Sequence, residues 1–171
     1  MRDKKGIVPG AILIIFALGM IAFFLIPLRS VLVIQTVNPE AAVFCATMSK
    51  GEEWMISFTH SVNRRPVYDV LQVEGQGIRI LRSRYDTFGA GMPDVSTPEN
   101  PLRVGTDGWL EYRVNRWVPD LTIRVGRVAG HVLHIKGRII PFASLAEPGE
   151  ALRFSAERQS LYQCWKGRCA W

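Results

Sequence analysis

Cysteine and histidine are scarce in this sequence, with three residues of each among 171. Only Cys164 and Cys169 lie close together, so a zinc site with four cysteine or histidine ligands is not expected. His131 and His134 are three positions apart, and on one strand such side chains point to opposite faces of the sheet. We therefore expect no metal and no cofactor, and we interpret these two histidines as surface or turn residues.

Helical periodicity is missing from most of the chain. Beyond residue 29, no long segment keeps the 3.6-residue spacing of apolar side chains that marks an amphipathic helix. Short runs rich in valine, isoleucine and phenylalanine occur instead, separated by glycine, proline and asparagine. These runs cover residues 30–36, 41–48, 54–60, 67–73, 78–85, 108–114, 121–128, 131–136, 138–142 and 151–157. The pattern predicts an all-β fold, either an antiparallel β-sandwich or a partly open barrel.

A strong excess of one charge is also absent from the region that carries these runs. The chain has a net charge of +6, and residues 1–29 supply +3 of it, with Arg2, Lys4, Lys5 and Arg29 against Asp3. The remaining +3 argues against a dedicated nucleic-acid-binding domain, which usually gathers its basic residues in a stripe. We expect no nucleic-acid partner, whereas anionic ligands and lipid head groups are compatible with this charge.

A long uncharged segment is present at the amino terminus, where residues 7–28 carry no charge. A helix needs about 20 apolar residues to cross a bilayer, and the basic residues before the segment place the amino terminus in the cytoplasm. A cleaved signal peptide is the alternative, because Ala17 and Gly19 form a small-x-small site, but the run exceeds the usual signal core. We predict a transmembrane anchor over residues 1–29 in the bacterial inner (cytoplasmic) membrane, followed by an extracytoplasmic β domain over residues 30–171.

A polar turn between two alternating runs predicts a β-hairpin. With the turn centred on Asn63 and Arg64, Phe58 would face Asp69 across the two strands. One face of the hairpin is then apolar apart from His60 and Asp69, which become diagonal neighbours. We expect these two side chains to pair in the core, because a buried charge needs a partner. An Asp69→Asn variant should in that case destabilise the fold.

Catalysis by His60 is not expected, although Ser61 and Asp69 would complete a Ser-His-Asp set. Ser61 follows His60 directly, so the two side chains leave a strand on opposite faces, whereas a nucleophile has to lie within hydrogen-bond reach of its base. A nucleophile-elbow motif is absent from the sequence as well. We therefore predict no catalytic residues and a non-enzymatic protein, and hydrolysis by His60 is the weakest alternative.

Residues 88–108 form a long stretch that is rich in glycine and proline. A loop of this length is usually functional or disordered, and its glycines allow positive φ and offer bare amides to a ligand. The glycine spacing is not that of a dinucleotide fingerprint, and no helix follows. The sequence leaves open whether the stretch serves a ligand or only the fold. The residues of this ligand or structural site are His60, Ser61, Asp69, Phe88, Gly89, Gly91 and Pro93.

Three motifs resemble an uncharacterised bacterial domain family whose members occur beside TAXI-type TRAP transporters, which import small organic acids. The motifs are Trp54-x-Ile-x-Phe-Thr-His-Ser-Val62, Pro66-Val-x-Asp69 and Tyr85-x-x-Phe-Gly-Ala-Gly-Met-Pro93. The family usually has glutamate where Asp69 stands, and leucine is commoner than Met92. The resemblance implies an accessory subunit that contacts the TRAP permease or the TAXI substrate-binding protein. The alternative is a periplasmic small-anion-binding domain that uses residues 88–93 and nearby arginines.

The carboxyl-terminal residues contain two of the three cysteines. Cys164 and Cys169 enclose a short loop with Gly167, and outside the cytoplasm this spacing predicts a disulfide between them. Cys45 would then be the unpaired thiol. Residues 162–171 also mix aromatic and basic side chains, which favours the membrane interface, a protein partner or a cover for a sheet edge.

Overall fold

The computed structural model of this chain describes residues 7–165, with side chains from residue 10 onward. In that range, helix α1 (Ile7–Leu25) precedes eleven strands, and a short helical turn, α2 (Leu161–Gln163), follows them. The strands are β1 (Arg29–Thr36), β2 (Ala41–Met48), β3 (Glu53–Thr59), β4 (Pro66–Glu74), β5 (Gly77–Tyr85), β6 (Leu102–Val104), β7 (Leu110–Val118), β8 (Asp120–Arg124), β9 (Val132–Ile135), β10 (Arg138–Pro141) and β11 (Ala151–Gln159). A 3₁₀ turn, η2 (Phe142–Ser144), links β10 to β11.

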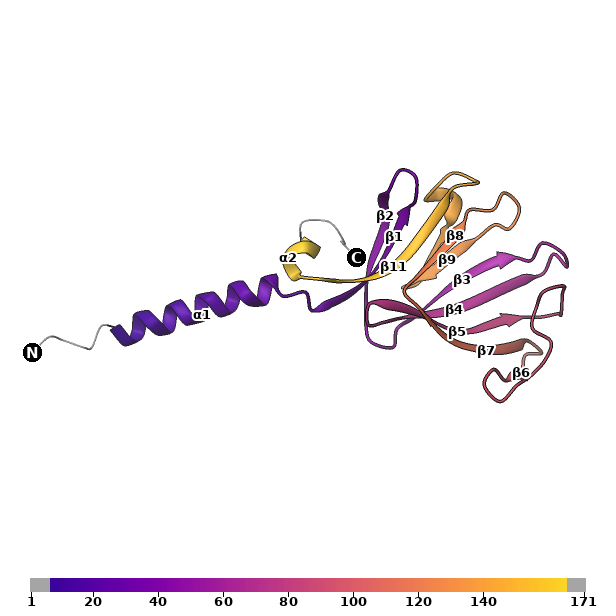
Figure 1. The fold of residues 1–171 in the computed structure, drawn as a ribbon, viewed down its shortest axis with the longest axis horizontal. Coiled ribbons are helices and arrows are strands. Elements are labelled where there is room, and N and C mark those ends of the chain that lie inside the picture. The colour runs from indigo at the N-terminus through magenta and orange to yellow at the C-terminus, as the bar shows by residue number, and fades with distance from the viewer. Residues whose placement is uncertain (1–6, 166–171) are drawn as a thin grey trace, which may run out of the picture.

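The strands form two antiparallel sheets that pack face to face, while α1 extends away from them (Figure 1). The smaller sheet has the strand order β2-β1-β11-β8, and the larger has the order β10-β9-β3-β4-β5-β7-β6. The chain crosses from the larger sheet to the smaller between β7 and β8, at Pro119, and returns at β9. The predicted antiparallel β-sandwich is therefore confirmed. The region expected to be loop over residues 88–108 contains one short strand, β6, at the edge of the larger sheet.

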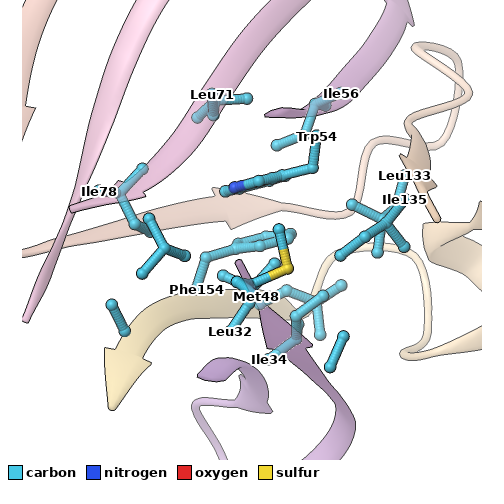
Figure 2. Packing of buried hydrophobic residues seen from close by; sticks show 14 of the residues in the cluster. Leu32, Ile34, Met48, Trp54, Ile56, Leu71, Ile78, Leu133, Ile135 and Phe154 are labelled. Carbon is cyan, nitrogen blue, oxygen red and sulfur yellow. The ribbon is translucent and has the colours of Figure 1, made fainter. Parts of the chain in front are cut away.

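The core lies between the two sheets, and side-chain alternation along the strands selects it. Leu32 on β1, and Trp54 and Ile56 on β3, point inward and are almost fully buried (Figure 2). The ring of Phe154 on β11 stacks on Trp54 with centroids 5.7 Å apart, and its centroid lies 5.4 Å from that of Phe142. This aromatic column joins the smaller sheet to the larger one.

The predicted β3–β4 hairpin forms, but its strand register differs from the prediction by two residues. Asp69 lies opposite Ile56, where the sequence predicted Phe58. The turn is longer than expected, because His60 already lies outside β3 and donates its N–H to the carbonyl oxygen of Arg65. A shift of two residues keeps every side chain on its predicted face, since strand periodicity is two. It does move Asp69 away from His60.

The amino-terminal helix is present as α1, whose described side chains are exposed. Within residues 7–165, the structure contains no helix that is both long enough and apolar enough to cross a membrane. Membrane insertion of α1 therefore stays a prediction.

The predicted cysteine pairing is wrong, since the structure has Cys164 as a free thiol and Cys45 in a disulfide bond. Cys169, the other residue of the predicted bridge, lies outside the described residues. Proximity in the sequence suggested that pair, but a disulfide forms only between sulfur atoms that the fold brings together. Cys45 is buried beside Val31 and Val33, on the face of the smaller sheet that points away from the core.

Alkylation of the unfolded, non-reduced protein should modify Cys164 and leave Cys45 unmodified. The physical reason is that a disulfide-bonded sulfur has no thiolate to react. Peptide mapping by mass spectrometry measures both sites, and the same sample alkylated after reduction is the control, in which both are modified. Modification of Cys45 before reduction would contradict this assignment.

Candidate functional site

A cavity of about 240 Å³ lies between the two sheets beside β8. Strand β8 has five residues and is the last strand of the smaller sheet, so this corner of the sandwich is thinly covered. Six of the lining side chains are apolar and two can ionise. They are Ile56, Phe58, Leu71, Ile80, Leu121 and Ile123, together with Asp69 and His131.

Asp69 is the acidic group of this cavity. Strand β4 places it on the inner face of the larger sheet, between Ile56 on β3 and Ser83 on β5. Its Oδ1 accepts a hydrogen bond from Ser83 Oγ at 2.5 Å. Burial raises the pKa of Asp69, and the Ser83 hydrogen bond only partly opposes that rise. Among the described side chains, none forms a salt bridge with Asp69.

His131 supplies the second polar group, from the segment just before β9. Its ring lies between two phenylalanines, with centroids 5.5 Å from Phe58 and 5.4 Å from Phe142. The Nδ1 atom is buried and has no hydrogen-bond partner within the described part of the chain. Burial lowers the pKa of His131, which favours the neutral imidazole at neutral pH. The interpretation of His131 as a surface or turn residue is thus incomplete, because its ring lines the cavity.

The predicted pair of His60 and Asp69 does not form. His60 Nδ1 accepts a hydrogen bond from the N–H of Val62 at 3.3 Å within the hairpin turn, and Ser61 is exposed in that turn. The shift in the β3–β4 register is the physical reason, because it places Asp69 opposite Ile56 and away from His60, while the β4–β5 pairing supplies Ser83 as its hydrogen-bond partner. Of the seven residues of the predicted site, Asp69 lies in the cavity, and the other six lie in the hairpin turn or in residues 88–93.

Those six residues belong to a loop cluster, in which residues 88–93 pack against the hairpin turn. The Asn63 side-chain amide donates to the carbonyl oxygen of Phe88 at 3.4 Å. A Cβ atom on Gly89 would come within 2.7 Å of Asn63 Nδ2 and 3.5 Å of His60 Cε1. Glycine at this position therefore allows the two loops to approach each other closely.

A second contact holds the other end of residues 88–93. The hydroxyl of Tyr85 donates to the carbonyl oxygen of Pro93 at 2.5 Å, while Gly91 is exposed with a φ of +80°. Arg65 in the hairpin turn forms an ion pair with Asp86. These contacts tie the loop to the hairpin and give the loop cluster a structural role.

The sequence did not specify which arginines lie near this loop, and two arginines of β5, Arg82 and Arg84, lie on the outer face of the larger sheet. Arg82 donates to both carboxylate oxygens of Glu53, at 3.0 and 2.7 Å, and Arg84 pairs with Asp107 at 2.7 Å. Their positive charges are thus already matched by carboxylates. An anion site at residues 88–93 stays a prediction.

Sequence reasoning missed Ser83 and the contribution of His131 to the cavity. Ser83 could have been found from the sequence, because it lies two residues before the buried Tyr85 on β5 and therefore on the same face of the sheet. His131 had no such signal, since it lies before β9 and reaches the cavity only through the packing of the two sheets.

The fold and its site define this protein as an antiparallel β-sandwich with a small, mainly apolar cavity between its sheets. The chain belongs to the DUF1850 family, a domain of unknown function, whose family model matches residues 55–142. That region contains the loop cluster, Asp69 and His131 of the cavity, and Ser83, which donates to Asp69. No curated protein and no solved structure matches the chain. Membership of an uncharacterised domain family is thereby confirmed, and the link to TRAP transporters stays a prediction.

An Asp69→Asn variant should be more stable than the wild type at pH 7, by about 1 kcal/mol, which is opposite to the effect expected from a His60–Asp69 pair. Asparagine keeps an oxygen that can accept the Ser83 hydrogen bond and removes the charge that burial disfavours. The folded-state pKa of Asp69 is raised above its ordinary value of 3.8, so the wild type loses stability as pH rises from there through the folded-state pKa. The advantage of the variant should therefore vanish in acid and grow with pH across that window.

Urea unfolding at a series of pH values measures this difference. Asp107→Asn is the matched control, because it removes an exposed carboxylate in an ion pair with Arg84 and should change stability by less than about 1 kcal/mol. An Asp69→Asn variant that is less stable than the wild type at pH 7 would show that the carboxylate is stabilised in the fold.

Proposed function

We propose that α1 anchors this protein in the bacterial inner membrane, with the amino terminus in the cytoplasm and the β domain outside it. The observation that carries the proposal is the exposed apolar surface of α1, on which Leu13, Ile15 and Phe16 are 72%, 70% and 71% exposed. Water-soluble proteins rarely leave a large continuous apolar surface uncovered. The uncharged segment of the sequence continues beyond α1 and covers residues 7–28, and about 20 such residues are needed to cross the hydrocarbon core.

The disulfide at Cys45 supports the extracytoplasmic position of the β domain. Structural disulfides persist in oxidising compartments and are rare in the cytoplasm. The bonded cysteine lies on β2, within the β domain and beyond α1 in the chain. Its oxidation is therefore consistent with the topology that the basic residues before α1 predict.

The proposed role is non-enzymatic, as an accessory subunit of a TAXI-type TRAP transporter for small organic acids. The resemblance of three motifs within residues 54–93 supports the partner, and the separation of His60 from Asp69 supports the absence of catalysis.

A second serine–histidine contact occurs between β3 and β9, where Ser57 Oγ lies 2.7 Å from His134 Nε2. A nucleophile and its base also need a group that orients the base and donors that stabilise an oxyanion. No carboxylate among the described side chains forms a salt bridge with His134.

The contact face that we propose is the outer face of the larger sheet, around Trp109. The Tyr68 and Trp109 ring centroids are 5.5 Å apart, and the Arg84 guanidinium lies 5.8 Å from the Trp109 ring centroid. Tyrosine, tryptophan and arginine are the residues most enriched at protein interfaces and their energetic centres. A groove of about 450 Å³ on the same face includes Arg82, Arg84 and Glu53 in its lining, so it offers charged groups of both signs to a protein partner.

Co-purification tests this proposal. Tagged full-length protein from gently solubilised native membranes should carry a TRAP permease or a TAXI substrate-binding protein in near-stoichiometric amount, identified by mass spectrometry. Arg84→Glu should reduce that recovery, whereas Arg127→Glu makes the same charge change at an exposed loop position and should not. Recovery of the wild type alone, while other inner-membrane complexes stay intact, would reject the accessory role.

A further inference from the structure

The carboxyl group of Asp69, which is half-buried on the inner face of the larger sheet, has no cationic partner among the described side chains. Buried charges in proteins are paired with an opposite charge or bind a metal, because leaving water is costly for an ion. Asp69 receives one neutral hydrogen bond, from Ser83, and no described cationic side chain forms a salt bridge with it. Burial raises its pKa, which is the signature of a carboxylate without compensation. A cation placed beside it would be stabilised.

The space beside Asp69 is large enough for a small organic molecule. The cavity measures about 240 Å³, whereas an apolar cavity of about 150 Å³ is sufficient to bind benzene. Six apolar side chains, among them Ile56, Ile80 and Ile123, line the remainder of its wall. The cavity is smaller than the usual site for a drug-sized ligand, which limits the occupant to roughly ten non-hydrogen atoms.

We propose that this cavity binds a small primary amine with an apolar body, whose ammonium group pairs with Asp69. The ammonium donates charge-assisted hydrogen bonds to the carboxylate, and the body is buried among the isoleucine, leucine and phenylalanine side chains. His131 is the second ionisable residue of the lining, and its ring adds to the wall that surrounds the ligand. This inference does not depend on the membrane partner proposed above.

The same geometry disfavours organic acids in the cavity. A carboxylate ligand would face the Asp69 carboxylate without an intervening cation, and like charges at short distance repel in a poorly solvated site. The ligand of the cavity is therefore chemically distinct from the small organic acids that a TAXI-type TRAP transporter imports. A neutral ligand with the same body gains the apolar contacts and lacks the ion pair.

Benzylamine, benzyl alcohol and benzoate share a phenyl ring and differ in carrying a cationic, a neutral or an anionic group, so they distinguish the three classes of ligand. The experiment titrates each probe into full-length protein in detergent micelles, with isoleucine methyl groups labelled for NMR. Benzylamine should shift the methyl signals of Ile56, Ile80 and Ile123 saturably. It should also bind about tenfold more tightly than either of the other two probes, as expected for one charge-assisted interaction.

Variants connect binding to the named residues. Asp69→Asn should weaken benzylamine about tenfold and leave benzyl alcohol nearly unchanged, whereas the surface control Asp107→Asn should leave both unchanged. Ile123→Trp fills the cavity and should remove saturable binding of every probe. The proposal is overturned by benzylamine shifts that do not saturate, by benzoate binding as tight as that of benzylamine, or by benzylamine binding that Asp69→Asn does not weaken.

Discussion

Replacing Phe154 with alanine should lower the free energy of unfolding of the β domain by about 3–5 kcal/mol. Phe154 is fully buried, and its ring contacts Trp54 of the larger sheet and Phe142 of η2. The substitution removes the central ring of the aromatic column and leaves a cavity that rigid strands on both sides cannot close. Since a domain of this size has a total stability of about 5–15 kcal/mol, the loss is a large share of it.

Denaturant unfolding followed by tryptophan fluorescence measures the loss. Phe88→Ala is the matched control, because Phe88 is 49% exposed in the loop cluster and the same deletion there should cost less than about 1 kcal/mol. Equal unfolding midpoints for the two variants would mean that the Phe154 ring is not a central part of the core.

Removing residues 1–28 should move the protein from the membrane fraction to the soluble fraction. The truncation deletes α1 and leaves β1, which begins at Arg29, intact. The physical reason is that the β domain buries its apolar side chains between its own sheets, whereas the side chains of α1 are exposed. Membrane fractionation with an alkaline carbonate wash measures the result, because the wash releases proteins that are held only by a partner.

A point variant in α1 gives a sharper version of this test. Ile15→Arg places a charge in the middle of α1, which costs about 3 kcal/mol in a membrane span, and should reduce the carbonate-resistant fraction. Val128→Arg is the matched control, an exposed apolar residue of the β domain, and should not. Full-length wild type in the soluble fraction would refute the anchor, and so would carbonate-resistant truncated protein.

The hairpin shows how much of the fold was predictable from the sequence. Alternation along residues 54–60 and 67–73 identified Trp54, Ile56 and Leu71 as inward-facing, and all three are buried in the core. The prediction survived the error in register, because a shift of two residues does not exchange the faces of a strand. The turn length could not be read locally, since the end of β3 also bonds to a distant loop, where Thr59 N–H donates to the Ala129 carbonyl oxygen.

The candidate site was only partly predictable. Asp69 was correctly identified as the unusual acid on an apolar face, but its partner was wrong, and Ser83 replaced His60. The loop cluster of residues 88–93 does meet His60 in space, through Gly89 and Asn63. His131 and Ile123 were not connected with Asp69, because their contacts depend on how β8 and the segment before β9 pack against the larger sheet.

The sequence by itself determined the β content, the buried faces of the strands and the apolar helix at the amino terminus. These features follow from periodicity and composition, which act over a few neighbouring residues. The tertiary structure decided the hairpin register, the oxidation of Cys45 rather than Cys164, and the meeting of Asp69 with His131 in one cavity. Those features depend on contacts between residues far apart in the chain, and only the packing of the two sheets brings such residues together.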